Sequence, residues 1–353
     1  MPEKRSSPSW VLASCVWMGT VVMLVCFVYI LHNSSSSRAH DIGGSSTSVP
    51  RSTVSSRTFL CTGTKYPDIS QDAVRSRLAL QMATAAVASG FELCVVDEGS
   101  DPAFVAALKR TGAFVVEEEN HSSTMGENRR RAVRCAYDMA LRKLKDVDEN
   151  GRSLTTTTTA NNVVYRAHSS AELPFSFSPT DANEPIALVF LEPEKAPLIP
   201  HLFALVAPVL SGHADLALPF RDAISVESYP REQALTEELA NRGLAQMGYF
   251  KPGEFDMVFG PFAISVEGLR FVLEYDGHFG DLWDGIIVPR LRMLLSPSHR
   301  SRVVSVPVPY IHPVEMSDSE EGKTDFLFKR LFQLNSVLNA SRSEFERWST
   351  ARG

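Results

Sequence analysis

The sequence predicts an α/β protein with a Rossmann-like, mostly parallel sheet flanked by helices. From residue 58 onward, short apolar runs alternate with longer segments of helical periodicity. This order of strand, helix and strand is typical of parallel strands joined by right-handed crossovers, with helices on both faces of the sheet. The run 186–191 is apolar throughout, as expected of a strand that is buried on both of its faces.

The individual elements follow from the same patterns. Runs rich in β-branched and aromatic residues predict strands at 58–63, 91–97, 113–116, 186–191, 215–220 and 302–308. Stretches with apolar residues at helical spacing predict helices at 72–88, 101–110, 124–145, 198–210, 231–246, 266–273, 282–295 and 323–348. The last of these helices carries an apolar stripe, which we assign to core packing.

One stretch interrupts this alternation. Between residues 146 and 184 the periodicity stops, and residues 155–159 are all threonine. A segment of this length without regular structure is uncommon inside a compact domain. We therefore predict one globular domain over 58–348, with a disordered polar insertion at about 146–184.

The composition is that of a globular protein that carries one membrane anchor. The chain has 353 residues, 44% of them hydrophobic, and its net charge of −6 argues against a surface for nucleic acid. Residues 10–31 carry no charge, and at about 1.5 Å per residue they are long enough to cross a hydrocarbon core of about 30 Å. The apolar region of a cleaved signal peptide is usually only about 7–15 residues long. We therefore expect a retained transmembrane signal anchor.

The flanking residues predict the orientation of this anchor. Lys4 and Arg5 precede it, so the positive-inside rule places the tail 1–9 in the cytosol and the rest of the chain in the lumen. Residues 32–57 are rich in serine and bury almost nothing, which is typical of a flexible stem. We expect a single-pass type II protein of the Golgi or endoplasmic reticulum membrane.

Two further features bear on the lumenal compartment. Asn120 and Asn339 begin glycosylation sequons, which agree weakly with a lumenal, glycosylated protein. Cys61 and Cys94 fall in apolar strand patterns, so we expect buried free thiols at both positions.

An acid pair follows the apolar run 186–191. If the strand continues, Glu192 and Glu194 leave it on the same face, because side chains alternate along a strand. They would then lie at the carboxyl edge of the sheet, where open α/β sheets bind ligands. Two carboxylates there suit a divalent cation that also holds phosphate oxygens. The structural alternative is a solvated Glu-Pro-Glu turn that opens the next helix.

The predicted strand 91–97 ends in a loop that suits a base or a ribose. The carboxylate of Asp97 can accept hydrogen bonds from ring N–H or hydroxyl groups, and Gly99 permits close approach. The alternative is an ordinary Asp-Gly turn, with Asp101 capping the next helix.

The start of the predicted helix 124–145 is a natural anion site. Thr124 and Glu127 fit a capping box, so we assign Glu127 a structural role. Backbone N–H groups at this helix start, together with the guanidinium of Arg129, can bind a negatively charged group.

Two more candidates lie near the C-terminus. Asp284 either caps the helix 282–295 or, beside the hydrophobic Trp283 in a cleft, serves as a general base or positions an acceptor hydroxyl. His312 is either a packed polar residue or a third ligand for a cation held near Glu192 and Glu194.

The order of these motifs resembles that of GT-A-fold glycosyltransferases. The nearest group is the family 2-like nucleotide-diphospho-sugar transferases, with some similarity to the mannosylglycerate synthases. The resemblance covers about residues 58–313. The motifs are 95–100, 126–129, the acid pair, 215–221, 282–284, and 306–308 with His312.

The resemblance implies how the donor would be held. Asp97 would contact the nucleotide base, and Asn128 and Arg129 would lie near the nucleotide. The acid pair would bind the diphosphate through Mg²⁺ or Mn²⁺. The usual motif there is Asp-x-Asp, whereas this chain has Glu192-Pro193-Glu194. Lys195 could supply positive charge in place of the metal.

The resemblance also implies the remaining roles. His312 matches the C-terminal metal-binding histidine of many members, and Asp284 matches the position of the catalytic acid. We therefore expect a membrane-anchored enzyme that moves a sugar from a UDP- or GDP-sugar to a hydroxyl acceptor. The alternative is a catalytically inactive protein that keeps the fold and binds a nucleotide sugar.

Overall fold

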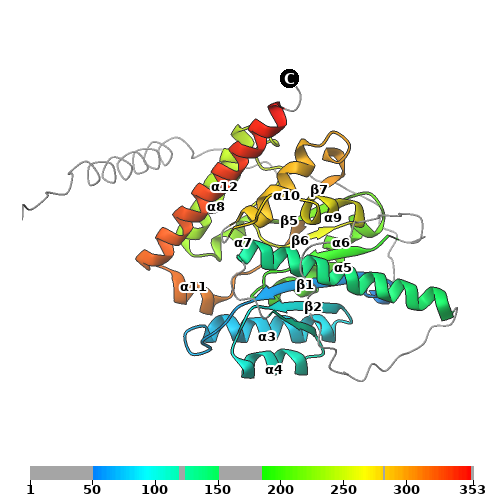
Figure 1. The fold of residues 1–353 in the computed structure, drawn as a ribbon. Helices are drawn as coiled ribbons and strands as arrows, with labels where there is room; N and C mark the ends of the chain where they lie inside the picture. The colour runs from blue at the N-terminus through cyan, green and yellow to red at the C-terminus, as the bar shows by residue number, and fades with distance from the viewer. Residues whose placement is uncertain (1–50, 119–123, 151–184, 281–282, 351–353) are drawn as a thin grey trace, which may run out of the picture. The chain divides into compact units, whose positions relative to one another are not determined.

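The computed structural model describes residues 51–118, 124–150, 185–280 and 283–350 (Figure 1). The expected anchor at 10–31, most of the expected stem, the sequon at Asn120 and most of the expected insertion lie outside these residues. Among the described residues, no helix combines the length and the apolar character needed to span a bilayer. All of the described residues belong to one compact unit.

A seven-stranded sheet forms the centre of this unit (Figure 1). The strand order is β3-β2-β1-β4-β6-β5-β7, and every neighbouring pair is parallel except the two that involve β6. The strands are β1 Thr58–Thr64, β2 Glu92–Asp97, β3 Phe114–Glu117, β4 Ala187–Phe190, β5 Leu216–Arg221, β6 Phe262–Ile264 and β7 Val303–Val308. The mostly parallel α/β sheet that we expected is therefore confirmed, and only the short antiparallel β6 was missed.

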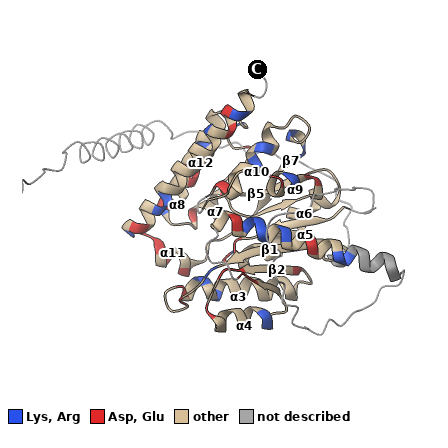
Figure 2. Cartoon of the chain, in the orientation of Figure 1, with Lys and Arg blue, Asp and Glu red and all other residues tan. Residues whose placement is uncertain are grey.

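Helices cover both faces of the sheet. The main helices are α3 Ala73–Ala88, α4 Pro102–Arg110, α5 Met125–Asn150, α6 Leu202–Leu210, α8 Arg231–Gln246, α9 Val266–Leu273, α10 Asp284–Leu295 and α12 Thr324–Thr350. Short helices are α2 Arg51–Ser56, α7 Ala223–Glu227, α11 Val314–Glu320, η1 Ala196–His201 and η2 Arg300–Arg302. Charged residues are concentrated on the helices, while β1, β4, β6 and β7 carry none (Figure 2).

The alternation of side chains along β1 explains the two layers. Phe59 and Cys61 belong to the apolar cluster that includes α5, α9 and α10, whereas Leu60 belongs to the cluster that includes α3, α4 and α6. Successive side chains of a strand point to opposite faces, so one strand contributes to both cores. All three residues are at most 2% exposed.

Three expected boundaries need correction. The end of the expected stem is folded: α2 packs on the body through Val54, and the side chain of Arg57 donates hydrogen bonds to the carbonyl oxygens of Pro185 and Leu210. The expected helix 198–210 begins as the 3₁₀ helix η1, which contains Pro200, and continues as α6. Helix α5 runs to Asn150, so the first residues of the expected insertion are helical.

The expectation for Cys94 was wrong. Cys94 of β2 forms a disulfide with Cys135 of α5, and the two Cα atoms are 6.3 Å apart. Helix α5 packs directly on β2 at this point, and the pairing of two residues 41 positions apart depends on that packing. Cys61, in contrast, is the buried free thiol that we expected.

Candidate active site

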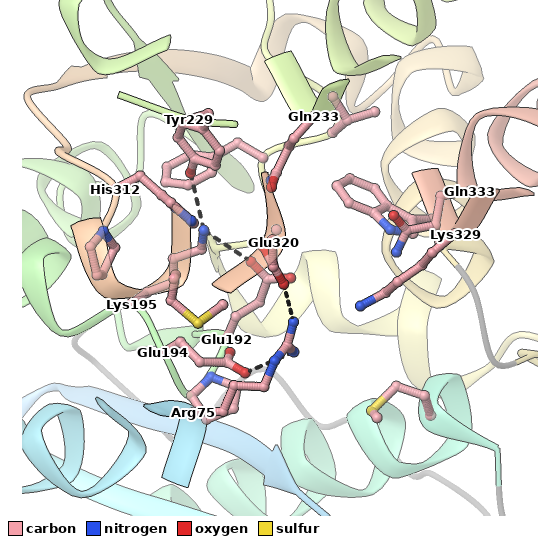
Figure 3. Close-up of a pocket in the computed structure, with 18 of the residues that line it drawn as sticks. Arg75, Glu192, Glu194, Lys195, Tyr229, Gln233, His312, Glu320, Lys329 and Gln333 are labelled. Carbon is pink, nitrogen blue, oxygen red and sulfur yellow. Dashed lines mark hydrogen bonds and ion pairs between the residues drawn. The ribbon is translucent and has the colours of Figure 1, made fainter. Parts of the chain in front are cut away.

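A polar cavity of about 480 Å³ opens at the carboxyl edge of the sheet (Figure 3). Residues that follow the ends of β1, β4 and β7 line it, together with side chains of α3, α5, α8 and α12. Because parallel strands end at one edge, segments far apart in the chain meet there. This cavity is the candidate active site.

The acid pair lies in this cavity, but not on one strand face as we expected. Strand β4 ends at Phe190, and the backbone N–H of Lys195 donates to the carbonyl oxygen of Glu192 at 3.0 Å. Residues 192–195 therefore form a turn, and the two carboxylates have different partners. Glu192 Oε2 lies 3.6 Å from Lys195 Nζ, whereas Glu194 Oε1 lies 3.3 Å from Arg75 Nη1.

Positive charge dominates the surroundings of Glu192. Burial alone would raise the pKa of Glu192, but the charges of Lys195, Arg129, Arg330 and Arg290 outweigh it and hold that pKa below its usual value. Lys195 lies in the turn before η1, and the three arginines lie on α5, α10 and α12. Glu192 is therefore an ionised carboxylate in a basic environment.

Gly260 lies against the carboxylate of Glu192. A Cβ atom added at Gly260 would lie 2.4 Å from Cδ of Glu192, so a larger residue would push the carboxylate away. The loop that carries Gly260 is held by the buried guanidinium of Arg290, which donates to four carbonyl oxygens of residues 257–261. Burial lowers the pKa of Arg290 to about 9, and the negative charges of Asp256 and Glu192 oppose this shift.

Lys195 is a buried ammonium in an aromatic enclosure. The residue is only 6% exposed, and its Nζ atom donates to the hydroxyl of Tyr229 at 3.0 Å. Nζ also lies 4.8–5.2 Å from the ring centroids of Tyr229, Phe259 and Tyr310. Cation–π attraction, the hydrogen bond and the ion pair with Glu192 together fix the position of this charge (Figure 3).

Arg75 links Glu194 to Glu320 of α11. Its Nη2 atom donates to Glu320 Oε1 of α11 at 2.5 Å, while Nη1 faces Glu194 (Figure 3). The hydroxyl of Tyr66 also donates to Glu194 Oε1, at 3.2 Å. Glu194 is therefore neutralised by a guanidinium and held by a phenol.

Arg129 lies near the acid pair and near Asp284, the predicted catalytic residue. Arg129 lines the cavity; burial lowers its pKa, and the negative charges of Glu192, Asp284 and Glu194 oppose this shift. Asp284 is the first residue of α10, and its Oδ2 atom accepts a hydrogen bond from the N–H of Gly280. Asp284 thus lies beside Arg129 without itself lining the cavity, while the preceding Trp283 does line it.

His312 lines the cavity as a neutral imidazole. Its ring stacks on Tyr229 with centroids 4.2 Å apart, and neither ring nitrogen has a hydrogen-bond partner within the described residues. Burial, reinforced by nearby cations such as Lys195, lowers the pKa of His312 to about 2. The ring can therefore donate from one nitrogen and accept at the other.

Three predicted residues lie behind the wall of the cavity. Both oxygens of Asp97 accept hydrogen bonds from its surroundings, namely from Thr64 Oγ1 at 2.7 Å and from the backbone N–H groups of Gly99 and Ser100. Gly99 has a φ of +83°, which favours glycine. Asn128 is fully buried against Gly63. Their contacts with a nucleotide stay predictions.

The three predicted metal ligands do not form a ligand set. In the parts of the chain that the structure describes, no three His, Cys, Asp or Glu side chains are grouped to hold a metal ion. Glu192 and Glu194 each face a protein cation instead, because the turn separates them. The arrangement therefore does not fit the expected site of Glu192, Glu194 and His312.

Several residues that line the cavity were not predicted from the sequence. Tyr229, Phe259 and Gly260 line the cavity. Other polar side chains that line it belong to no sequence motif and were therefore missed. They are Arg75, Gln233, Glu320, Lys329, Arg330 and Gln333.

A mostly parallel seven-stranded sheet with a polar cavity at its carboxyl edge defines an α/β protein with a candidate ligand site. No protein-family model and no curated protein matches the chain. Among solved structures, the chain is similar to glucosyl-3-phosphoglycerate synthase from Mycobacterium tuberculosis in complex with Mn²⁺, uridine-diphosphate-glucose and phosphoglyceric acid. The identity is 14%, the TM-score is 0.47, and 86% of this chain and 85% of that chain are covered.

A second similar structure is described as a mycobacterial protein. It has 14% identity and a TM-score of 0.48, and covers 82% of this chain and 77% of its own.

Proposed function

We propose that the protein is a glycosyltransferase that moves a sugar from a UDP- or GDP-sugar to a hydroxyl acceptor. The observation that carries this proposal is the convergence of cations and carboxylates in one cavity. Lys195 and Arg129 face Glu192 there, beside the aromatic rings of Trp283 and Tyr229. Cations suit a diphosphate, carboxylates accept from sugar hydroxyls, and aromatic faces pack on sugar rings.

The same residues suit the chemistry of sugar transfer. When the bond between the sugar and the diphosphate breaks, negative charge builds up on the departing phosphate oxygen. A fixed cation stabilises that charge, because it needs no reorganisation during the step. The carboxylate of Asp284 would accept the proton of the attacking hydroxyl or orient that hydroxyl, depending on whether configuration is inverted or retained.

We also propose a type II orientation in the membrane of the Golgi or endoplasmic reticulum. The uncharged stretch 10–31 and the preceding Lys4 and Arg5 support it. The disulfide between Cys94 and Cys135 gives independent support, since disulfides persist in oxidising compartments such as the lumen of the secretory pathway.

The test uses the purified full-length protein and a panel of nucleotide sugars, with release of UDP or GDP as the readout. The variants Glu194→Gln and Asp284→Asn should each lower the rate of release about 100-fold or more. Asp276→Asn is the matched control, because the side chain of Asp276 is 89% exposed and does not line the cavity. Wild-type rates in both site variants would refute the site assignment.

The second candidate function is binding of a nucleotide sugar without transfer. It is favoured by one observation, namely that both glutamates of the acid pair are already held by protein cations. Calorimetry separates the two candidates: heat of binding for a nucleotide sugar, with no UDP or GDP released across a broad set of hydroxyl acceptors, would support binding alone.

A further inference from the structure

Resting on the proposed function, we infer that protein cations hold the donor diphosphate at this site in place of a divalent metal ion. Lys195 provides the fixed charge at the position of the acid pair, and Arg129 provides the second charge from the start of α5. The inference concerns only the binding of the diphosphate, and it leaves the identity of the sugar and of the acceptor open.

The first support is the geometry of residues 192–195. A metal ion shared by two carboxylates requires both to point at one position. The turn closed between Glu192 and Lys195 prevents this, since it turns Glu192 toward Lys195 and Glu194 toward Arg75 (Figure 3). Lys195 Nζ is therefore close to the position that a metal ion beside Glu192 would take.

The second support is the balance of charge. Four cations act on Glu192, of which Lys195, Arg129 and Arg330 line the cavity and Arg290 lies behind its wall. An added divalent cation beside Glu192 would be repelled by all four, and three other carboxylates that line the cavity already have protein partners: Glu194 and Glu320 share Arg75, and Glu237 pairs with Arg221. An anion placed beside Lys195 would be attracted by the same four cations and repelled by Glu192.

The third support is the rigidity of the ammonium. A lysine side chain normally loses much rotamer freedom when it binds a ligand, which weakens binding. Lys195 has already lost that freedom, because three aromatic rings, the hydroxyl of Tyr229 and Glu192 hold it before any ligand arrives. A fixed point charge in a buried site is the property that a bound metal ion would otherwise contribute.

A further cation faces the same cavity from the C-terminal helix α12. Lys329 of α12 lines the cavity and, among the described residues, makes no hydrogen bond or ion pair (Figure 3). Burial and the nearby charges of Arg75 and Arg330 lower its pKa. Lys329 therefore adds to the positive potential without contributing to the enclosure around Lys195.

The test is calorimetric titration of the full-length protein with UDP and with GDP, in EDTA and in MnCl₂. We expect the better nucleotide to bind in EDTA with a dissociation constant within about twofold of that in Mn²⁺. Tenfold or greater loss of affinity in EDTA would overturn the inference and leave the proposed function standing. No binding of either nucleotide under both conditions would overturn the proposed function, and the inference with it.

Variants of the lysine give a second readout. Lys195→Met should weaken diphosphate binding in EDTA by about 10- to 100-fold, the range of a lost charge-assisted hydrogen bond. Lys195→Arg should restore part of the affinity, and Mn²⁺ should improve neither Lys195→Met nor the wild type, because Glu192 and Glu194 still diverge. Lys109→Met is the matched control, because Lys109 pairs with Glu117 on the surface and does not line the cavity. Equal losses in Lys195→Met and Lys109→Met would contradict a special role for Lys195.

Discussion

The buried guanidinium of Arg290 gives the sharpest test of how the cavity wall is held. Arg290 is 1% exposed, and its Nη1 and Nη2 atoms donate to the carbonyl oxygens of Met257, Phe259, Gly260 and Pro261 at 2.5–3.1 Å. The variant Arg290→Met keeps most of the length of the side chain and removes every donor. Four carbonyl groups of one loop then lose their partner at once.

The expected cost follows from these four acceptors. A buried polar group left without a partner costs about 1–3 kcal/mol, but neighbouring losses are not additive, because the loop can shift and admit water. Taking the lower end for each acceptor, Arg290→Met should lower the free energy of unfolding by about 4 kcal/mol. That is a large part of the roughly 5–15 kcal/mol that stabilise an ordinary domain.

The assay is urea unfolding of the full-length protein, followed by tryptophan fluorescence. Arg270→Met is the control: Arg270 is on the surface of α9 and forms an ion pair with Glu274 at 3.3 Å. Loss of such an exposed pair should cost less than about 0.5 kcal/mol. If Arg290→Met remains within about 1 kcal/mol of the wild type, Arg290 does not hold the loop.

Three further predictions concern pH, the acid pair and the disulfide. The pKa of His312 is about 2, below the ordinary 6.5, so only the unfolded chain binds this proton between these values. Stability should fall by about 2 kcal/mol from pH 8 to pH 5, and His312→Phe should remove that part of the loss. Gly260→Ala should displace Glu192 and lower nucleotide release about tenfold or more, with little change in melting temperature. Replacing Cys94 and Cys135 by alanine should lower the free energy of unfolding by about 4 kcal/mol in a chain-entropy estimate, measured by urea unfolding.

Each of these predictions has a result that would contradict it. The exposed His213 is the control for pH, and His213→Asn should leave the pH dependence unchanged. An unchanged slope in His312→Phe would show that the imidazole is protonated in the folded protein. Wild-type release by Gly260→Ala would mean that the position of Glu192 does not matter. Equal stability of the disulfide variant and the wild type would contradict a disulfide in the folded chain.

Strands and helices were predictable wherever a local pattern carried the information. The apolar run 186–191 and the periodic segments 231–246 and 266–273 match observed elements to within about a residue. Strand β6 was missed because three residues are too few to show a period. The helical start at 51–56 was missed because its stability comes from the contact of Val54 with the body.

The candidate site was predictable in part for a related reason. Glu192, Lys195 and Arg129 were found because they lie where a predicted strand ends or a predicted helix begins. Asp97 was expected at the same edge, but its carboxylate is used to close its own loop. Lys329 and its neighbours on α12 were missed, because nothing in a local pattern shows which helix will cover a distant strand end.

The sequence by itself determined the order of strands and helices, the parallel sheet and the edge at which the candidate cavity opens. These properties depend on residues close together in the chain, whose periodicity decides which face is buried. Only the tertiary structure decided that Glu192 and Glu194 diverge, that Lys195 is enclosed by aromatic rings, and that Cys94 meets Cys135. Those outcomes depend on contacts between segments tens of residues apart, and no local pattern specifies the relative position of such segments.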